Sequence, residues 1–328
     1  MANTTNTVIT DGGGDYLTLN AAEDGIDGTA YGAGETATIN CSGTTADTTP
    51  VTFAGWDADV SVIINGDAHT GIYDTGHYRL ETVNSATDTL DIDISNATVN
   101  GIQVRVTVTT GASDIAAISG NGTNNVVKKC ICYAVYSEFK RGYGINLLGT
   151  SGYAFNNVIY DFRDVGTASS IGIVAQDDAG GDSYYIYSNT VYNCRTGIYN
   201  TGSGTFQLKN NISNGCTSVD YSVTGVNASA TNISEDATSP DVAFRSKAVT
   251  FVGETSSPRD LHLASTDTNA KDAGTDTSGE AAPLNFTDDI DGVTRTGTWD
   301  IGADEYTPSG GASGTVLNLC TISGARIG

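Results

Sequence analysis

The chain is built from short runs in which apolar and polar residues alternate, and Gly, Asn or Ser breaks each run. In one such run, Val60, Val62 and Ile64 occupy alternate positions. Alternate side chains of a β-strand point to the same face, so this run predicts a strand with one apolar face. The recurrence of such runs between turn residues predicts many short β-strands rather than helices.

These runs also repeat one another at intervals of roughly 20 to 30 residues, a spacing that is typical of solenoid proteins. Three related segments place an Asn at the same point, at Asn157, Asn189 and Asn211. A second series of Gly-Ile pairs begins at Gly144, Gly172 and Gly197. The repeats have neither a leucine ladder nor a helix-pair pattern, so they favour a right-handed parallel β-helix, an all-β fold.

In such a fold, an Asn at a coil corner tolerates left-handed backbone and can bond its amide to the Asn of the next coil. Apolar side chains at alternate positions point inward and stack on those of the neighbouring coils. Residues 51–81 then form one early coil. Within it we expect Val60, Val62 and Ile64 to face inward, and Gly71-Ile72 to start the next strand.

The ends of a solenoid need caps, because each coil packs only on its neighbours. We therefore divide the chain into an N-terminal cap (1–34), coils (35–265), a C-terminal cap segment (266–306) and an extension (307–328). A short helix whose apolar face comprises Leu17, Leu19, Ala22 and Ile26 would form the N-terminal lid.

The C-terminal extension begins with a Pro/Gly/Ser linker and continues with a weakly alternating segment. An apolar strand tethered outside a closed fold could add to the sheet edge of a partner. The alternative is a frayed or self-docked tail. The residues expected to bind the partner are Val316, Leu319, Ile322 and Ile327.

Composition supports the strand-rich interpretation and limits the partners. The chain has 40 Gly, 5 Pro and a net charge of −23. Such acidity argues against nucleic acid, whose phosphates require Lys and Arg, and against anionic membranes. No secretory signal or membrane-spanning stretch is visible, so we expect synthesis in a host cytoplasm without ordinary export.

Segments near both ends resemble known β-helix proteins. DGGGDYLTLNAAEDGI (11–26) resembles the opening of right-handed β-helix proteins, including bacteriophage virion proteins and, more distantly, pectin methylesterases and other pectin lyase-like proteins. RDLHLASTDTNAKDAGT (259–275) and DDIDGVTRTGTWDIGADEY (288–306) resemble the closing segments of secreted and viral members. Because these proteins include both enzymes and inert structural proteins, the resemblance implies a fold rather than one activity.

If the chain were an enzyme, its expected substrate would be a polysaccharide lying along the helix, cleaved by paired carboxylates or by a base with acidic Ca²⁺ ligands. The candidate catalytic residues are Asp161, Arg163, Asp164, Asp177 and Asp178. The motifs of pectin methylesterases are not reproduced, since YDT at 73–75 lacks the Gln of their QDT motif and Asp161-Phe162 has no matching Arg motif. We therefore assign no catalytic residue.

The sequence Asp288-Asp289-Ile290-Asp291-Gly292 could bring acidic side chains to one Ca²⁺ ion. No Glu follows at the spacing of an EF-hand, so the alternative is a tight acidic turn that Arg295 neutralises. We expect no cofactor, with Ca²⁺ at Asp288, Asp289 and Asp291 as the alternative. In the closing DIGADEY motif we expect Ile301 and Tyr306 to face inward, and Asp300 and Glu305 outward.

Three functions remain in competition. The first is a non-enzymatic virion protein, either a capsid decoration (cementing) or a fibre subunit, whose partners are capsid or other virion proteins and further copies of itself, for example in a trimer. The second is a polysaccharide-degrading tailspike or secreted pectin-lyase-like enzyme. The third is an adhesin module that binds a surface glycan, with tyrosines of the middle coils as stacking platforms.

Overall fold

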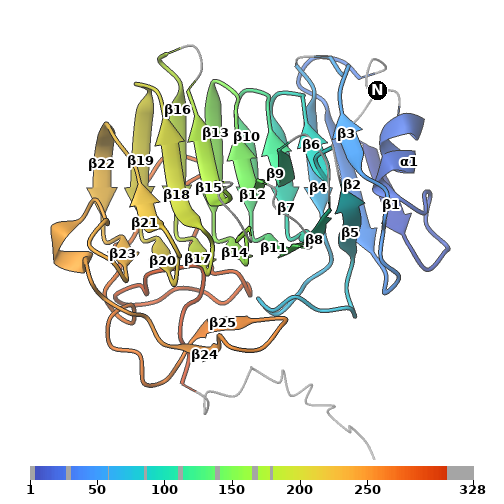
Figure 1. The fold of residues 1–328 in the computed structure, drawn as a ribbon. Helices are drawn as coiled ribbons and strands as arrows, with labels where there is room; N and C mark the ends of the chain where they lie inside the picture. Colours follow the sequence, from blue (N-terminus) through green and yellow to red (C-terminus); the bar gives the residue numbers. More distant parts are fainter. Residues whose placement is uncertain are drawn as a thin grey trace, which may run out of the picture.

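The computed structural model describes residues 4–26, 31–57, 59–84, 87–109, 114–136, 141–164, 169–177 and 180–308. They form a right-handed parallel β-helix in which three long parallel sheets run side by side (Figure 1). The expected fold class is therefore confirmed. We name the sheets A, B and C, and call the stack of coils the rod.

The strands of the rod are short. Sheet A contains β1 (Thr4–Ile9), β2 (Thr36–Ser42), β4 (Ser61–Asn65), β7 (Ala97–Asn100), β10 (Asn125–Lys128), β13 (Ser151–Phe155), β16 (Ser183–Tyr187), β19 (Thr205–Lys209) and β22 (Val226–Ala230). Sheet B contains β5 (Arg79–Asn84), β8 (Gln103–Val108), β11 (Ile131–Tyr136), β14 (Val158–Tyr160), β17 (Thr190–Tyr192), β20 (Ile212–Asn214) and β23 (Ile233–Ser234). Sheet C contains β3 (Val51–Phe53), β6 (Leu90–Ile92), β9 (Ile115–Gly120), β12 (Gly142–Leu147), β15 (Ile171–Gln176), β18 (Thr196–Thr201) and β21 (Val219–Ser222).

Each coil gives one strand to sheet C, then one to sheet A and one to sheet B, and equivalent apolar residues stack inside the rod. Ile145, Ile173 and Ile198 are paired in register and fully buried. The repeated Gly-Ile pairs of the sequence are therefore equivalent positions of successive coils. A second inner column, on sheet A, comprises Ile39, Ile64, Val99, Val127, Ala154, Ile186 and Leu208.

Residues 51–81 reach from β3 through β4 into β5, so this stretch is nearly one whole coil, as predicted. Val60, Val62 and Ile64 are buried, which confirms the inward face. The prediction that Gly71-Ile72 starts a strand is wrong, because both residues lie in the connection between β4 and β5. A Cβ on Gly71 would come within 2.6 Å of an Asp291 carboxylate oxygen, and its φ is +67°, so a close approach explains this glycine.

The corner between sheets A and B carries a buried ladder of asparagines, as the repeat predicts. The side-chain amide of Asn157 donates to Asn189 at 2.9 Å, Asn189 donates to Asn211 at 3.0 Å, and Asn211 donates to Asn232 at 2.8 Å. Asp241 accepts the last amide of the ladder at 2.7 Å. The residues before the four ladder positions have positive φ, and they are Asn156, Ser188, Asn210 and Thr231.

The N-terminal end of the rod is covered by a short helix that the sequence predicts. The helix α1 (Leu19–Gly25) begins at Thr18, whose side chain accepts a hydrogen bond from the Ala21 amide. Leu19, Ala22 and Ile26 are buried as expected, whereas Leu17 is 59% exposed and does not belong to the apolar face.

The other end of the rod is closed by residues that directly follow β23. Asp236 accepts the Asp220 amide of the last coil, and Asp220 in turn accepts the amides of Glu235 and Asp236. The 3-10 helix η2 (Val242–Phe244) follows Asp241. The sequence analysis assigned residues up to 265 to coils, but beyond β23 the described chain up to that point has only η2 and strands β24 (Phe251–Gly253) and β25 (Asp260–Leu263).

The C-terminal segment, which we define as residues 235–308, folds back along the side of the rod (Figure 1). Its apolar residues Leu261, Ile290 and Ile301 pack in one cluster with Ile131 and Ile212 of sheet B. The Ala303 amide donates to the Thr190 hydroxyl at 3.0 Å. Leu284, Phe286 and Trp299 pack instead on Val126, Phe155 and Tyr187 of sheet A. Residues 266–306 therefore lie along the side of the rod, against sheets A and B, instead of capping the last coil.

The closing motif is also oriented differently from the expectation. Ile301 is fully buried as predicted, and Tyr306 is half-buried. Asp300 and Glu305, expected to point outward, are only 4% and 8% exposed. Arg295 is buried with them and donates to Glu305 and to the carbonyls of Gly302 and Ala303.

Candidate functional sites

Two of the candidate catalytic residues, Asp161 and Arg163, line one pocket of about 320 Å³ next to the end of β14. Asp161 pairs with Arg259 of the C-terminal segment at 2.8 Å and accepts a hydrogen bond from Asn193 at 2.6 Å. Arg163 donates to the amide oxygen of the same Asn193. Asp161 thus serves to attach the C-terminal segment to the rod, and its φ of +64° marks the corner at which sheet B ends.

The remaining acidic candidates do not join this pocket. Asp164 is buried, with 6% of its surface exposed, and is not among the pocket residues. Asp177 follows β15 at the corner from sheet C to sheet A, whereas Asp161 lies at the corner from sheet B to sheet C. Asp177 accepts the amides of Gly180 and Ser203, which is a loop-shaping role. Asp178 lies outside the described residues.

The three acids considered for Ca²⁺ point to different partners. Asp288 pairs with Lys129 of the rod at 2.5 Å. Asp289 is fully buried and accepts the backbone amides of Asp291, Val293 and Glu305. Asp291 instead lies beside His262, so the alternating acids of the sequence do not converge on one point.

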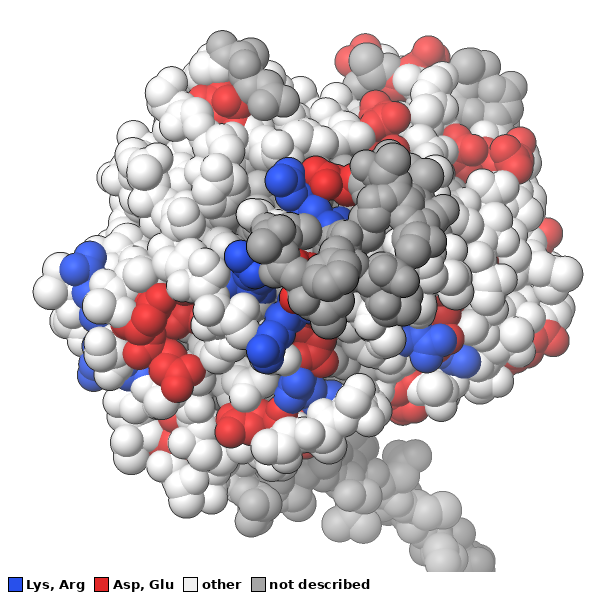
Figure 2. All heavy atoms as spheres, viewed as in Figure 1, with Lys and Arg blue, Asp and Glu red and all other residues white. Residues whose placement is uncertain are grey.

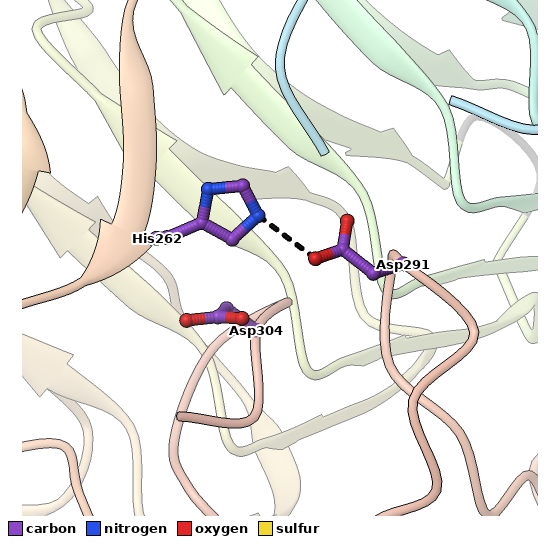
Figure 3. A group of neighbouring side chains, drawn as sticks. All are labelled: His262, Asp291 and Asp304. Atoms are coloured by element: carbon purple, nitrogen blue, oxygen red, sulfur yellow. Dashed lines mark hydrogen bonds and ion pairs between the residues drawn. The ribbon is translucent and has the colours of Figure 1, made fainter. Parts of the chain in front are cut away.

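Asp291 belongs to a cluster that sequence reasoning missed. It accepts a hydrogen bond from Nε2 of His262 at 2.9 Å, and Asp304 lies beside the same imidazole (Figure 3). Burial alone would lower the pKa of His262, but the hydrogen bond of Asp291 and the charges of Asp304 and Asp291 raise it to about 10. Burial raises the pKa of Asp304 to about 7, against the opposing effect of His262.

A second surface feature lies on the outer face of sheet C, which we call the sheet C groove. It has a volume of about 430 Å³ and an apolar floor that includes Ile171 and Val174, with Tyr143 and Tyr199 beside it. Gln176 adds an amide that donates to Asn146 at 2.7 Å. The alternating pattern of strands β12, β15 and β18 contains these residues, but their joint exposure on one face depends on the coil register.

Most of the other mid-chain tyrosines pack on equivalent rings of neighbouring coils. Tyr133 stacks on Tyr160, and Tyr153 stacks on Tyr185, each with ring centroids 5.0 Å apart. Stacking of this kind stabilises adjacent coils and leaves few rings for a ligand. The sheet C groove is therefore the best aromatic surface among the described residues.

On the face drawn in Figure 2, several Lys and Arg side chains lie beside Asp and Glu side chains, whereas the Asp and Glu side chains at the upper right have no such neighbour in view. Arg105 pairs with Glu81 on the outer face of sheet B, and Lys209 pairs with Glu280 of the C-terminal segment. The pair of Lys209 with Glu280 joins the rod to the C-terminal segment, as do the pairs Lys129–Asp288 and Arg259–Asp161. They also occupy many of the cations that an anionic ligand would need.

Comparison with models of known protein families and with curated proteins found no match. Within the described part of the chain, no helix has the length and apolar character needed to cross a membrane.

Proposed function

We propose that this chain is a non-enzymatic structural protein of a bacteriophage virion, either a capsid decoration (cementing) or a fibre subunit. The proposal rests on one observation: the candidate catalytic acids make structural contacts within the fold. Asp161 fixes Arg259, and Asp177 orders the turn at Gly180 and Ser203. A hydrolase needs two carboxylates that face one glycosidic bond, and Asp161 and Asp177 lie at different corners of the coil.

The architecture suits a structural role. The strands pair along the whole length of the rod, so only the first and last coils have open edges. The N-terminal end is covered by α1, and the other end by Asp236 and Asp241. Attachment to a larger assembly is assigned to the apolar tail positions Val316, Leu319, Ile322 and Ile327, which lie outside the described residues.

The test is a density gradient of particles from the source, probed for this chain. Co-banding with intact particles at stoichiometric amounts is the expected result, and a high copy number would favour decoration over a fibre. Deletion of residues 307–328 should leave a folded rod that no longer attaches. Recovery of the full chain only as free protein would overturn the proposal, and full attachment of the truncated chain would overturn the role of the tail.

A glycan-binding module is a second candidate, favoured by the sheet C groove alone. Sugar rings stack on aromatic faces and bond to amides, and this groove offers Tyr143, Tyr199 and Gln176. A glycan array should then show binding that Tyr199→Ala removes, while Tyr153→Ala, on a different sheet, retains it. Binding unchanged by Tyr199→Ala would exclude the groove.

A further inference from the structure

Three separate parts of the C-terminal segment bring metal-ligand atoms together beside Gly71 of the rod. His262 comes from β25, Asp291 from the acidic turn and Asp304 from the closing motif. One ligand atom from each of the three side chains lies within 4.8 Å of those of the other two. Figure 3 shows Nε2 of His262 directed at Asp291, with the carboxylate of Asp304 below the ring.

The three side chains are held in place by further contacts. Asp260 lies 2.6 Å from Nδ1 of His262, so its carboxylate can accept the Nδ1 proton and leave Nε2 as the ligand atom. An outer carboxylate on a ligating histidine is the usual arrangement in metal sites. Asp304 accepts the Leu263 amide at 2.7 Å, which fixes the carboxylate beside β25.

The local charge also favours a cation. Three carboxyl groups, those of Asp260, Asp291 and Asp304, lie around one imidazole, so acidic side chains outnumber the basic one. The neighbouring cation Lys129 is already paired with Asp288. Gly71 lies against the group without a side chain, since a Cβ there would come within 2.7 Å of Nε2 of His262. A divalent cation held there would lie among carboxylate oxygens and the imidazole of His262.

We propose that His262, Asp291 and Asp304 bind a divalent first-row transition metal ion, of which Zn²⁺ is the probe. One imidazole and two carboxylates are a donor set that suits Zn²⁺ or Mn²⁺, whereas Ca²⁺ prefers six to eight oxygens. The ion would join β25, the acidic turn and the closing motif. This inference does not depend on the virion proposal.

Isothermal titration of the full chain, freed of metal by chelation, tests the site. We expect one Zn²⁺ per chain and a rise in melting temperature on adding Zn²⁺, with no such rise on adding Ca²⁺ at the same concentration. Co²⁺ should give the visible bands of a nitrogen and oxygen site without a thiolate charge-transfer band. Absence of Zn²⁺ binding, or a thiolate band, would overturn the proposal.

Variants separate this site from other imidazole sites on the surface. His262→Ala and Asp291→Asn should each weaken Zn²⁺ binding at least about tenfold. The matched control is His77→Ala, because His77 also lies between two acids, Asp67 and Asp74, but at 3.6 Å from each. Binding lost in His77→Ala and retained in His262→Ala would overturn the assignment.

Two further variants keep the test decisive if His262→Ala does not fold. Asp288→Asn changes an adjacent acid whose partner is Lys129, and it should retain Zn²⁺ binding. Asp260→Asn leaves all three ligands in place and should weaken binding about 10- to 100-fold by removing the outer carboxylate. Equal Zn²⁺ affinity in both variants would contradict the site.

Discussion

The coils and the C-terminal segment bury different kinds of side chain. In the coils, Ile173 stacks between Ile145 and Ile198, so an apolar side chain contacts the equivalent apolar side chain of each neighbouring coil. In the C-terminal segment, Arg295 is 4% exposed and is surrounded by Glu305, Asp300 and backbone carbonyls. Repetition supplies the core of the coils, whereas the C-terminal segment depends on polar contacts that occur once.

This difference has a physical consequence. An apolar column loses one contact layer when a residue is changed, and its neighbours still stack. A buried charge has no substitute partner, so removal of one member leaves the other unpaired in a medium of low dielectric constant. The C-terminal segment should therefore be more sensitive to single polar substitutions than the rod.

The largest effect is expected for Arg295→Met. The change leaves Glu305 and the neighbouring Asp289 buried without their cation, and breaking a buried ion pair costs about 3–5 kcal/mol. Fluorescence of Trp299, which lies beside the guanidinium at 5.4 Å, should report loss of the C-terminal segment in urea before far-UV circular dichroism reports loss of the coils.

The matched control for that change is Arg141→Met. Arg141 pairs with Asp114 on the surface, where both side chains are more than 40% exposed, at 43% and 48%. Exposed pairs contribute about 1 kcal/mol or less. Equal unfolding midpoints for the two variants would contradict the contrast between the regions.

The joint between the two regions should be sensitive to pH. Burial raises the pKa of Asp220 from 3.8 to about 6, and the charge of Asp236 adds to this against the hydrogen bonds from the chain. The folded chain therefore holds the proton more tightly than the unfolded chain. The stability contributed by this group is complete below pH 3.8 and is lost as the pH rises through about 6, up to about 3 kcal/mol.

Urea unfolding of the parent chain and Asp220→Asn at pH 4 and pH 7 measures this contribution. The asparagine cannot ionise, so the variant should lose less stability than the parent between the two pH values. Parallel pH dependence in both proteins would show that Asp220 does not carry the effect.

The sequence allows prediction of the rod because its determinants are local and repeated. A corner residue with positive φ precedes Asn157, Asn189 and Asn211, and each ladder amide needs only the same residue one coil away. The repeat therefore indicates both the turn and its partner. Gly71 is the contrary case, since the reason for this glycine lies in His262 and Asp291, far along the chain.

The sequence does not allow prediction of how the C-terminal segment packs on the rod. Ala303 bonds to Thr190 and Asn156 bonds to the Asp288 carbonyl, across 113 and 132 residues with no periodicity to reveal either pair. The acidic turn identified Asp291, but no local pattern links it to His262, 29 residues earlier. Such contacts can be predicted only after the fold of the rod is known, because the apolar outer face of sheet B is what the segment packs against.

The smallest expected effect is the difference in stability between Asn→Ala changes in two asparagine ladders of the rod, one buried and one on the outer face. Asn189→Ala removes an amide that donates to Asn211 and to the Ala154 carbonyl in the interior, and unsatisfied buried groups cost about 1–3 kcal/mol. Asn65→Ala interrupts a ladder with Asn40 and Asn100 on the outer face of sheet A, where water can replace the amide, and should change stability by about 0.5 kcal/mol or less.

Thermal and urea unfolding of Asn189→Ala and Asn65→Ala measure this difference, because each variant removes one side-chain amide from a coil-to-coil ladder. A clear loss of stability in Asn189→Ala and almost none in Asn65→Ala would show that burial, rather than repetition alone, makes the inner ladder stabilising. Equal losses would mean that stacking of like residues stabilises the rod regardless of solvent access. The contrast between the coils and the C-terminal segment would then rest on charge alone.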